Sequence, residues 1–300
     1  MSVIQYHGNP NLKPYGVQIQ YTPRQIQEYI KCKEDPIYFI ENYCKIISLD
    51  DGLVPFKLYP YQREFIKALH KNRKIICMLS RQMGKTICVA AYIAWYAEFN
   101  DTKNIAVLAN KGAAAREILS RIQLIIENIP LWLQQGVVSW NKGSVELENG
   151  SKIFTGSTSS SGIRGQSVNF LYLDEFAIIP NTVAEDFLTA TYPTISSGKT
   201  TKIAITSTPL GLNHFWKMWN DSKQANNDFV NYFAHWSEHP NRDQEWALEQ
   251  RRLLGCEIKY NQEVECLGGN TKITIRHNNI IKEVTFLELE ELLNKSNQTT

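Results

Sequence analysis

The stretch Ile75-Ile76-Cys77-Met78-Leu79-Ser80-Arg81-Gln82-Met83-Gly84-Lys85-Thr86 decides the fold of this chain of 300 residues. Its first part is a continuous apolar run, which predicts a buried strand. A turn that contains Gly84 follows, and then residues 87–97 predict a helix. A strand, a turn and a helix in this order predict a phosphate-binding loop, because backbone N–H groups and a helix N-terminus then face an anion.

Two side chains at the end of this loop carry the predicted chemistry. Lys85 would reach the β- and γ-phosphates of a nucleotide, and the Thr86 hydroxyl would hold Mg²⁺. The common pattern has a glycine five residues before Gly84, where this chain has Leu79. An ordinary turn is the alternative, because Gly-Lys-Thr is frequent by chance.

Further apolar runs lie outward from the loop. Residues 105–109, 170–173 and 202–206 predict buried strands separated by helical stretches. This alternation is typical of an α/β fold, with a mostly parallel sheet that helices cover on both faces. Residues 145–154 alternate around an Asn-Gly turn and predict a hairpin.

The two ends of the chain have a helical pattern. Thr22-Pro23 and Asp35-Pro36 each combine a capping residue with a first-turn proline, so each predicts the start of a helix. The strand signal fades after about Asp221, and residues 243–259 predict one amphipathic helix.

Composition excludes some classes of protein. With 43% hydrophobic and 21% charged residues, the chain is not wholly disordered. The net charge of +2 argues neither for nor against a nucleic-acid partner. No apolar run approaches the roughly 20 residues of a membrane-spanning helix, and the start lacks the shape of a signal peptide. The six cysteines form no C-x-x-C pair, which favours reduced thiols in an intracellular protein.

Two carboxylates follow the predicted strand at 170–173. Asp174 can sit in the second shell of Mg²⁺ beside Thr86, and Glu175 can polarise a water for in-line attack on the γ-phosphate. Ligands bind at the carboxyl edge of a parallel sheet, where both this pair and the loop are expected. A solvated strand terminus is the alternative for two acids considered alone.

Two further groups of residues fit the same site. Tyr61 could stack on adenine, and the Gln62 amide could pair with it. The hydroxyls of Thr206, Ser207 and Thr208 end another predicted strand and could sense the γ-phosphate. A helix start and a strand-end cap are the respective structural alternatives.

In this order, these residues resemble the ATPase half of a tailed-bacteriophage (myovirus-type) terminase large subunit, the motor that packages DNA into procapsids. The loop Ser80-Arg81-Gln82-Met83-Gly84-Lys85-Thr86 is similar to that family's deviant Walker A motif, which also lacks the first glycine. Asp174 and Glu175 match its Walker B aspartate and catalytic glutamate. Tyr61-Gln62 matches its adenine-binding motif, and Thr206-Ser207-Thr208 its coupling motif; Met83 and Ser207 are mild departures.

The resemblance covers about residues 35–265 and implies a P-loop NTPase fold (RecA/ASCE-like) with a small helical lid. Two arginines compete for the role of neutralising transition-state charge, and relatives are thought to act as rings, which would suit Arg164. Arg164, on the predicted loop at 155–166, could reach a neighbouring subunit's nucleotide, whereas Arg81 could act within its own subunit. Three possibilities stay open: Arg164, Arg81, or neither arginine.

The end of the chain departs from the family. Gln262-Glu263 matches the lid's Gln-Glu pair, but from Cys266 the chain resembles the opening of an intein, with a Gly-Gly turn and Thr271 before a strand. In that chemistry the Cys266 thiolate would attack the Glu265 carbonyl in an N–S acyl shift. Asn270 departs from the usual Asp. We therefore predict an N-terminal intein fragment and no nuclease domain in this chain, with a divergent linker as the alternative.

The sequence thus predicts a Mg²⁺-dependent ATPase that couples ATP hydrolysis to translocation of double-stranded DNA. By resemblance its partners are further copies in a homo-oligomeric ring, a portal protein and a small terminase subunit. The intein resemblance adds a complementary intein-bearing chain as a candidate partner, and no membrane is expected. The expected location is the host cytoplasm, transiently on the procapsid. A helicase-type ATPase and an inactive half of a split gene are the rivals. The expected parts are an N-terminal helical segment (1–55), the ATPase core (56–235), the lid (236–265) and the intein fragment (266–300).

Overall fold

A central sheet organises the computed structural model, which describes residues 5–158, 163, 167–196, 198–266, 272–277, 280–285 and 288. In this part of the chain the sheet has eight strands in the order β10-β3-β9-β8-β4-β7-β6-β5. Their bounds are β3 (Lys74–Leu79), β4 (Asn104–Ala109), β5 (Val137–Trp140), β6 (Ser144–Leu147), β7 (Lys152–Ser157), β8 (Phe170–Asp174), β9 (Lys202–Ser207) and β10 (Val230–Ala234).

The predicted α/β fold with a mostly parallel sheet is confirmed. Neighbouring strands run parallel from β10 to β7, and β6 and β5 continue the sheet antiparallel. The predicted hairpin is the β6–β7 pair, and Gly150 supplies the positive φ of 80° that its turn needs.

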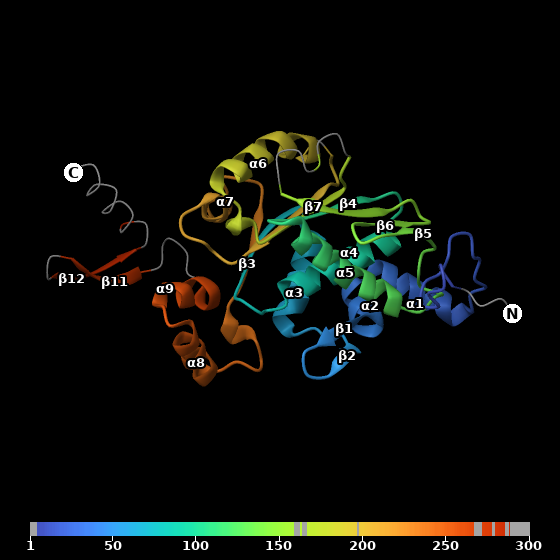
Figure 1. The fold of residues 1–300 in the computed structure, drawn as a ribbon, viewed down its shortest axis with the longest axis horizontal. Coiled ribbons are helices and arrows are strands. Elements are labelled where there is room, and N and C mark those ends of the chain that lie inside the picture. Colours follow the sequence, from blue (N-terminus) through green and yellow to red (C-terminus); the bar gives the residue numbers. More distant parts are fainter. Residues whose placement is uncertain are drawn as a thin grey trace.

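Alternate residues of each buried strand face two different cores. Ile75, Cys77 and Leu79 of β3 pack in the first core, and Ile76 and Met78 pack in the second. The first lies under α3 (Pro60–Lys71), α4 (Lys85–Phe99) and α5 (Gly112–Asn128), and the second under α6 (Asn181–Ser196) and α7 (His214–Lys223). Figure 1 shows these two helical layers on opposite sides of the sheet. The central strands β3, β4, β8 and β9 are mostly apolar because both faces of the sheet are covered there.

The N-terminal segment packs on the outer side of α4. Its helices α1 (Pro23–Glu34) and α2 (Pro36–Tyr43) begin where predicted, since Thr22 accepts from the N–H of Gln25 and Asp35 from that of Ile37. The prediction that residues 1–55 are helical is wrong for the described residues 5–22 and again beyond Tyr43. The chain there forms an antiparallel hairpin, β1 (Lys45–Ser48) and β2 (Gly52–Pro55), because β-branched residues flank an Asp-Asp-Gly turn.

A small helical subdomain follows β10. It comprises η2 (Trp236–Glu238), α8 (Gln244–Leu254), α9 (Glu257–Tyr260) and the π-helical turn η3 (Asn261–Glu265) around its own apolar cluster. The prediction of one helix over 243–259 is wrong, because Gly255 adopts a φ of +60° and ends α8. We call this subdomain the lid.

Two smaller features complete the described chain. A short helix, η1 (Phe176–Ile178), follows β8, and a separate antiparallel hairpin, β11 (Lys272–His277) and β12 (Ile280–Thr285), follows the lid (Figure 1). No helix among the described residues is both long and apolar enough to span a bilayer. All six cysteines are free.

Candidate functional site

The strand order brings the three predicted motifs to one edge of the sheet. Strand β9 lies between β3 and β8, and the three strands are parallel. The loop after β3, the acidic pair at the end of β8 and the hydroxyl residues at the end of β9 therefore lie side by side. This is the carboxyl edge of the sheet, where ligands bind in α/β folds.

The phosphate loop, residues 80–84, has a backbone that suits an anion. Gln82 and Gly84 both adopt left-handed conformations, with φ of 58° and 74°. Alternation with left-handed residues turns successive N–H groups toward a common point. A Cβ at Gly84 would also lie 2.6 Å from Gln62 Nε2, so the Gln62 amide would have to shift away from the loop. Gly84 is also the N-cap of α4, so the positive end of that helix faces the loop.

Lys85 and Glu175 meet at this edge. Lys85 Nζ lies 2.6 Å from Glu175 Oε1, and the lysine is only 9% exposed. Glu175 adopts a left-handed conformation with φ of 50°, which is uncommon for a residue with a side chain. Such strain at the end of a strand is often found at functional sites.

Asp174 is buried in a network of hydroxyl groups. Its Oδ1 accepts hydrogen bonds from Tyr172 Oη and from Thr206 Oγ1, each at 2.8 Å. Burial raises the pKa of Asp174, as does the neighbouring charge of Glu175, while Lys85 and the two hydroxyls act in the opposite direction. The two hydroxyls therefore favour the charged form of a carboxylate that burial disfavours.

Ser207 links the strand β9 to Glu175. Its hydroxyl accepts from the Ala177 N–H at 3.1 Å and donates to Glu175 Oε2 at 3.5 Å. Thr208, the third residue of the predicted coupling motif, is buried at the start of the following loop. Thr206 and Ser207 thus contact the acidic pair directly.

The side chains of Tyr61 and Gln62 bind the backbone of the phosphate loop. Tyr61 Oη and Gln62 Nε2 both donate to the Met83 carbonyl, at 2.9 and 3.2 Å, and Gln62 Oε1 accepts from the Tyr59 N–H. Tyr61 is only 3% exposed. In this structure both side chains therefore hold the loop, and stacking of a base on Tyr61 would need its ring to be uncovered.

These features agree with a match to a protein family. Residues 76–282 match the model of the family described as terminase large subunit, T4likevirus-type, N-terminal. The chain belongs to this family. The match includes the phosphate loop, the acidic pair and the lid of the terminase chain.

Solved terminase structures have the same fold. The large terminase ATPase domain of Thermus phage P74-26 is 23% identical, with a TM-score of 0.56 over 70% of this chain and 94% of that one. The HK97 bacteriophage large terminase is 17% identical, with a TM-score of 0.65 over 80% of this chain. A large terminase from a thermophilic bacteriophage in complex with ATP-γ-S is 14% identical, with a TM-score of 0.55 over 73% of this chain and 54% of that one. The terminase chain spans about 56% of the HK97 protein.

The lid of the terminase chain contacts the phosphate loop. The Arg81 N–H donates to the Glu263 carbonyl at 2.7 Å, and its guanidinium lies 3.7 Å from the Glu263 carboxylate. Ser80 Oγ donates to the Val264 carbonyl at 2.6 Å. The Gln262-Glu263 pair therefore lies against the loop, and Arg81, whose side chain is 61% exposed, faces the lid. Arg164 lies outside the described residues.

Thr86 and Cys266 both lie near the phosphate loop. Thr86 is in the first turn of α4, next to Lys85. Cys266 follows η3 and is 3% exposed. Burial raises the pKa of its thiol to about 12, and the groups that modulate it include Ser80 and Lys85, so the thiol lies beside the phosphate loop.

Sequence reasoning missed two residues of the site. Tyr172 precedes Asp174 by two positions on the same face of β8, and its hydroxyl had no pattern to mark it. Arg242 of the lid donates to two carbonyls of the phosphate loop across about 160 positions of sequence. Only the closeness in space of these residues shows their part in the site.

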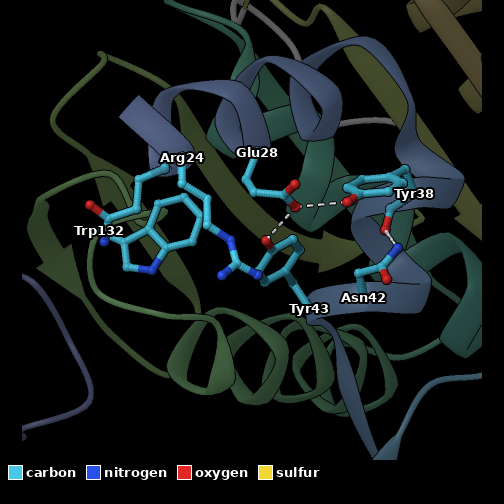
Figure 2. A pocket seen from close by; sticks show the side chains of 7 residues that line it. Arg24, Glu28, Tyr38, Asn42, Tyr43 and Trp132 are labelled. Carbon is cyan, nitrogen blue, oxygen red and sulfur yellow. Dashed lines mark hydrogen bonds between the residues drawn. The ribbon is translucent and has the colours of Figure 1, made fainter. Parts of the chain in front are cut away.

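A hollow of about 490 Å³ lies between α1, α2 and Trp132, away from the phosphate loop. Figure 2 shows Glu28 at its centre, with the hydroxyls of Tyr38 and Tyr43 pointing to one carboxylate oxygen. These hydrogen bonds measure 2.7 and 2.8 Å, and Lys31 donates to the other oxygen at 2.9 Å. The donors, Tyr38 first, lower the pKa of Glu28 to about 2. The hollow is therefore the edge of a network that joins α1 to α2.

Proposed function

We propose that this chain is the ATP-hydrolysing motor subunit of a viral DNA-packaging terminase, which couples ATP hydrolysis to translocation of double-stranded DNA into the procapsid. The observation that carries the proposal is the 2.6 Å contact of Lys85 and Glu175 beside a left-handed glycine loop, in a chain of the terminase family. A phosphate-binding lysine and a carboxylate at adjacent strand ends are the parts that ATP hydrolysis needs.

In the proposed mechanism the loop N–H groups and Lys85 bind the β- and γ-phosphates. Thr86 and Asp174 would hold Mg²⁺, since hydroxyl and carboxylate oxygens are its preferred ligands. Asp174 fits this role, because among the described residues its hydrogen bonds go to Oδ1 and leave Oδ2 for another partner. Bound Mg²⁺ would neutralise phosphate charge.

Glu175 acts as the group that polarises the attacking water. Here its carboxylate is paired with Lys85, and that lysine has to exchange Glu175 for phosphate when ATP binds. The exchange frees Glu175 Oε1 to accept a proton from water. Nucleotide binding and preparation of the base are thus one event.

Thr206 and Ser207 transmit the state of the site. Thr206 contacts Asp174, and Ser207 contacts both Glu175 and the Ala177 N–H at the start of η1. A change at either carboxylate therefore alters the contacts of β9 and η1, and η1 packs against α7. This is the path that we assign to coupling with DNA movement.

The remaining features of the proposal come from similar proteins. One large terminase of this fold was solved with ADP and with ATP-γ-S, which supports a nucleotide as ligand here. By family membership we propose a ring of copies, with double-stranded DNA, a portal protein and a small terminase subunit as partners. The proposed place of action is the host cytoplasm, at the procapsid.

Phosphate release from ATP tests the nucleotide site. We expect turnover by the wild-type chain with Mg²⁺, a loss of about 10²-fold or more in Lys85→Ala, and no change in the exposed control Lys67→Ala, which lies on α3. Equal turnover by Lys85→Ala would reject the site. Negligible turnover by the wild type would favour the split-gene alternative. Protection of DNA from nuclease, when procapsids are supplied, tests the packaging role.

We propose separately that the chain from Cys266 is the start of an intein. The strand expected after Thr271 is present as β11, although residues 267–271 and most of 286–300 lie outside the described residues. The family match runs to residue 282, past Cys266. Because its thiol is buried, Cys266 has to leave this position before the thiolate can attack Glu265.

Mixing the chain with a fragment that bears a complementary intein half tests this second proposal. A ligated product by mass spectrometry, absent in Cys266→Ala, is the expected result. If no product forms with any such fragment, then residues 266–300 are a linker.

A further inference from the structure

Arg242 holds the phosphate loop from the lid side. It precedes Asp243, the N-cap of α8, and its guanidinium donates to the Arg81 carbonyl at 3.1 Å and to the Gln82 carbonyl at 2.9 Å. The same group lies 3.5 Å from Met83 Sδ. A planar, forked donor that reaches two successive carbonyls fixes the orientation of both peptide units.

The carbonyls of the loop are held from two sides. Arg242 holds those of Arg81 and Gln82, and Tyr61 with Gln62 holds that of Met83. In a trans peptide the N–H points opposite to the carbonyl of the same unit, and the chain has no cis peptide among its described residues. The N–H groups of residues 82–84 therefore point away from these partners, as an anion-binding loop requires.

The position of Arg242 is itself fixed by packing. Its guanidinium carbon lies 4.2 Å from the ring centroid of Trp246, one turn into α8. Trp246 in turn packs against Trp236 of η2, with ring centroids 5.6 Å apart and the rings tilted by 39°. The guanidinium is therefore attached to the lid core rather than to a flexible surface, and it moves when the lid moves.

We propose that Arg242 is a positioning residue, which sets the anion-binding shape of the phosphate loop and makes nucleotide affinity depend on a closed lid. The inference rests on the proposed nucleotide site and goes beyond it, because it assigns a lid residue that does not itself need to touch the nucleotide. Two backbone contacts from one lid side chain give a direct mechanical link between lid position and phosphate binding.

Nucleotide titrations test the inference. Calorimetry with ADP and with ATP-γ-S is performed on the full chain as wild type, Arg242→Ala, Arg242→Lys and the control Arg252→Ala, which removes an exposed arginine from α8 of the same lid. We expect Kd to rise about tenfold in Arg242→Ala, since two hydrogen bonds to a charged group are lost. The Lys variant should be intermediate, because an ammonium cannot span both carbonyls, and Arg252→Ala should match the wild type.

Two further readouts separate positioning from loss of structure. KM for ATP should rise more than kcat falls, and amide exchange in peptides that cover residues 80–84 should quicken without nucleotide. If Arg242→Ala does not fold, then nucleotide Kd is compared between the wild type and Arg242→Lys, which retains the positive charge and the aliphatic part of the side chain. If the wild type binds nucleotide and the Arg242 variants bind it equally well, then the inference about Arg242 is overturned while the proposed function stands. A wild type that binds no nucleotide would overturn the proposed function and this inference with it.

Discussion

Asp174 and Thr206 lie opposite each other in the register of β8 and β9, and the Thr206 hydroxyl donates to Asp174 Oδ1 at 2.8 Å. Register alone places them together, because both are the last or next-to-last residues of adjacent parallel strands. The second donor, Tyr172, lies on the same face of β8 two positions earlier. The hydrogen bonds to Asp174 therefore come from two strands, and a change in either strand alters the surroundings of this carboxylate.

Replacement of Thr206 by Val tests this arrangement. The change keeps the shape of the side chain but removes one donor from a buried carboxylate, which leaves Asp174 held only by Tyr172. We expect kcat for ATP to fall by about 10- to 150-fold with little change in the Kd of ADP, since loss of a hydrogen bond to a charged group costs about 1.5–3 kcal/mol. Thr189→Val, at an exposed position on α6, is the matched control and should match the wild type. An unchanged kcat in Thr206→Val would remove the coupling role of this contact.

Glu175→Gln separates binding from hydrolysis. The amide cannot accept a proton from water, so turnover should fall by about 10²–10⁴. Nucleotide affinity should rise or stay constant, because Lys85 no longer forms an ion pair that competes with phosphate. Phosphate release and calorimetry measure the two effects, with Glu185→Gln on α6 as the control. Near-normal turnover would show that another group activates the water.

The strands that carry the site were predictable because they are buried on both faces. Residues 75–79, 105–109, 170–173 and 202–206 are continuous apolar runs, and each forms a strand of the sheet. The convergence of Lys85 and Glu175 follows from parallel strands that end at one edge. Local sequence was therefore enough to predict the four central strands and the edge of the sheet at which the acidic pair lies.

The parts that were not predictable depend on long-range contacts or on weak local signals. Strand β10 is a short edge strand with exposed Val230 and Phe233, so it lacks the apolar run of a buried strand. Gly255 divides the predicted helix over 243–259, although an isolated glycine is tolerated in many helices. Arg242 meets the loop only through the tertiary fold, and no spacing in the sequence marks such a contact.

Glu28 predicts how stability depends on pH. Its pKa is about 2 in the folded chain against an ordinary value of 4.5, because Tyr38, Lys31 and Tyr43 all donate to the charged carboxylate. A lowered pKa stabilises the fold above about pH 4.5, and this contribution is lost as the pH falls from there toward 2. Glu28→Gln should therefore show a smaller decrease in its urea midpoint than the wild type over this range, while Tyr43→Phe, with one donor fewer, should be intermediate. If the urea midpoints of wild type and Glu28→Gln fall in parallel between pH 5 and 2, then the hydrogen bonds to Glu28 (Figure 2) do not stabilise its charged carboxylate in solution.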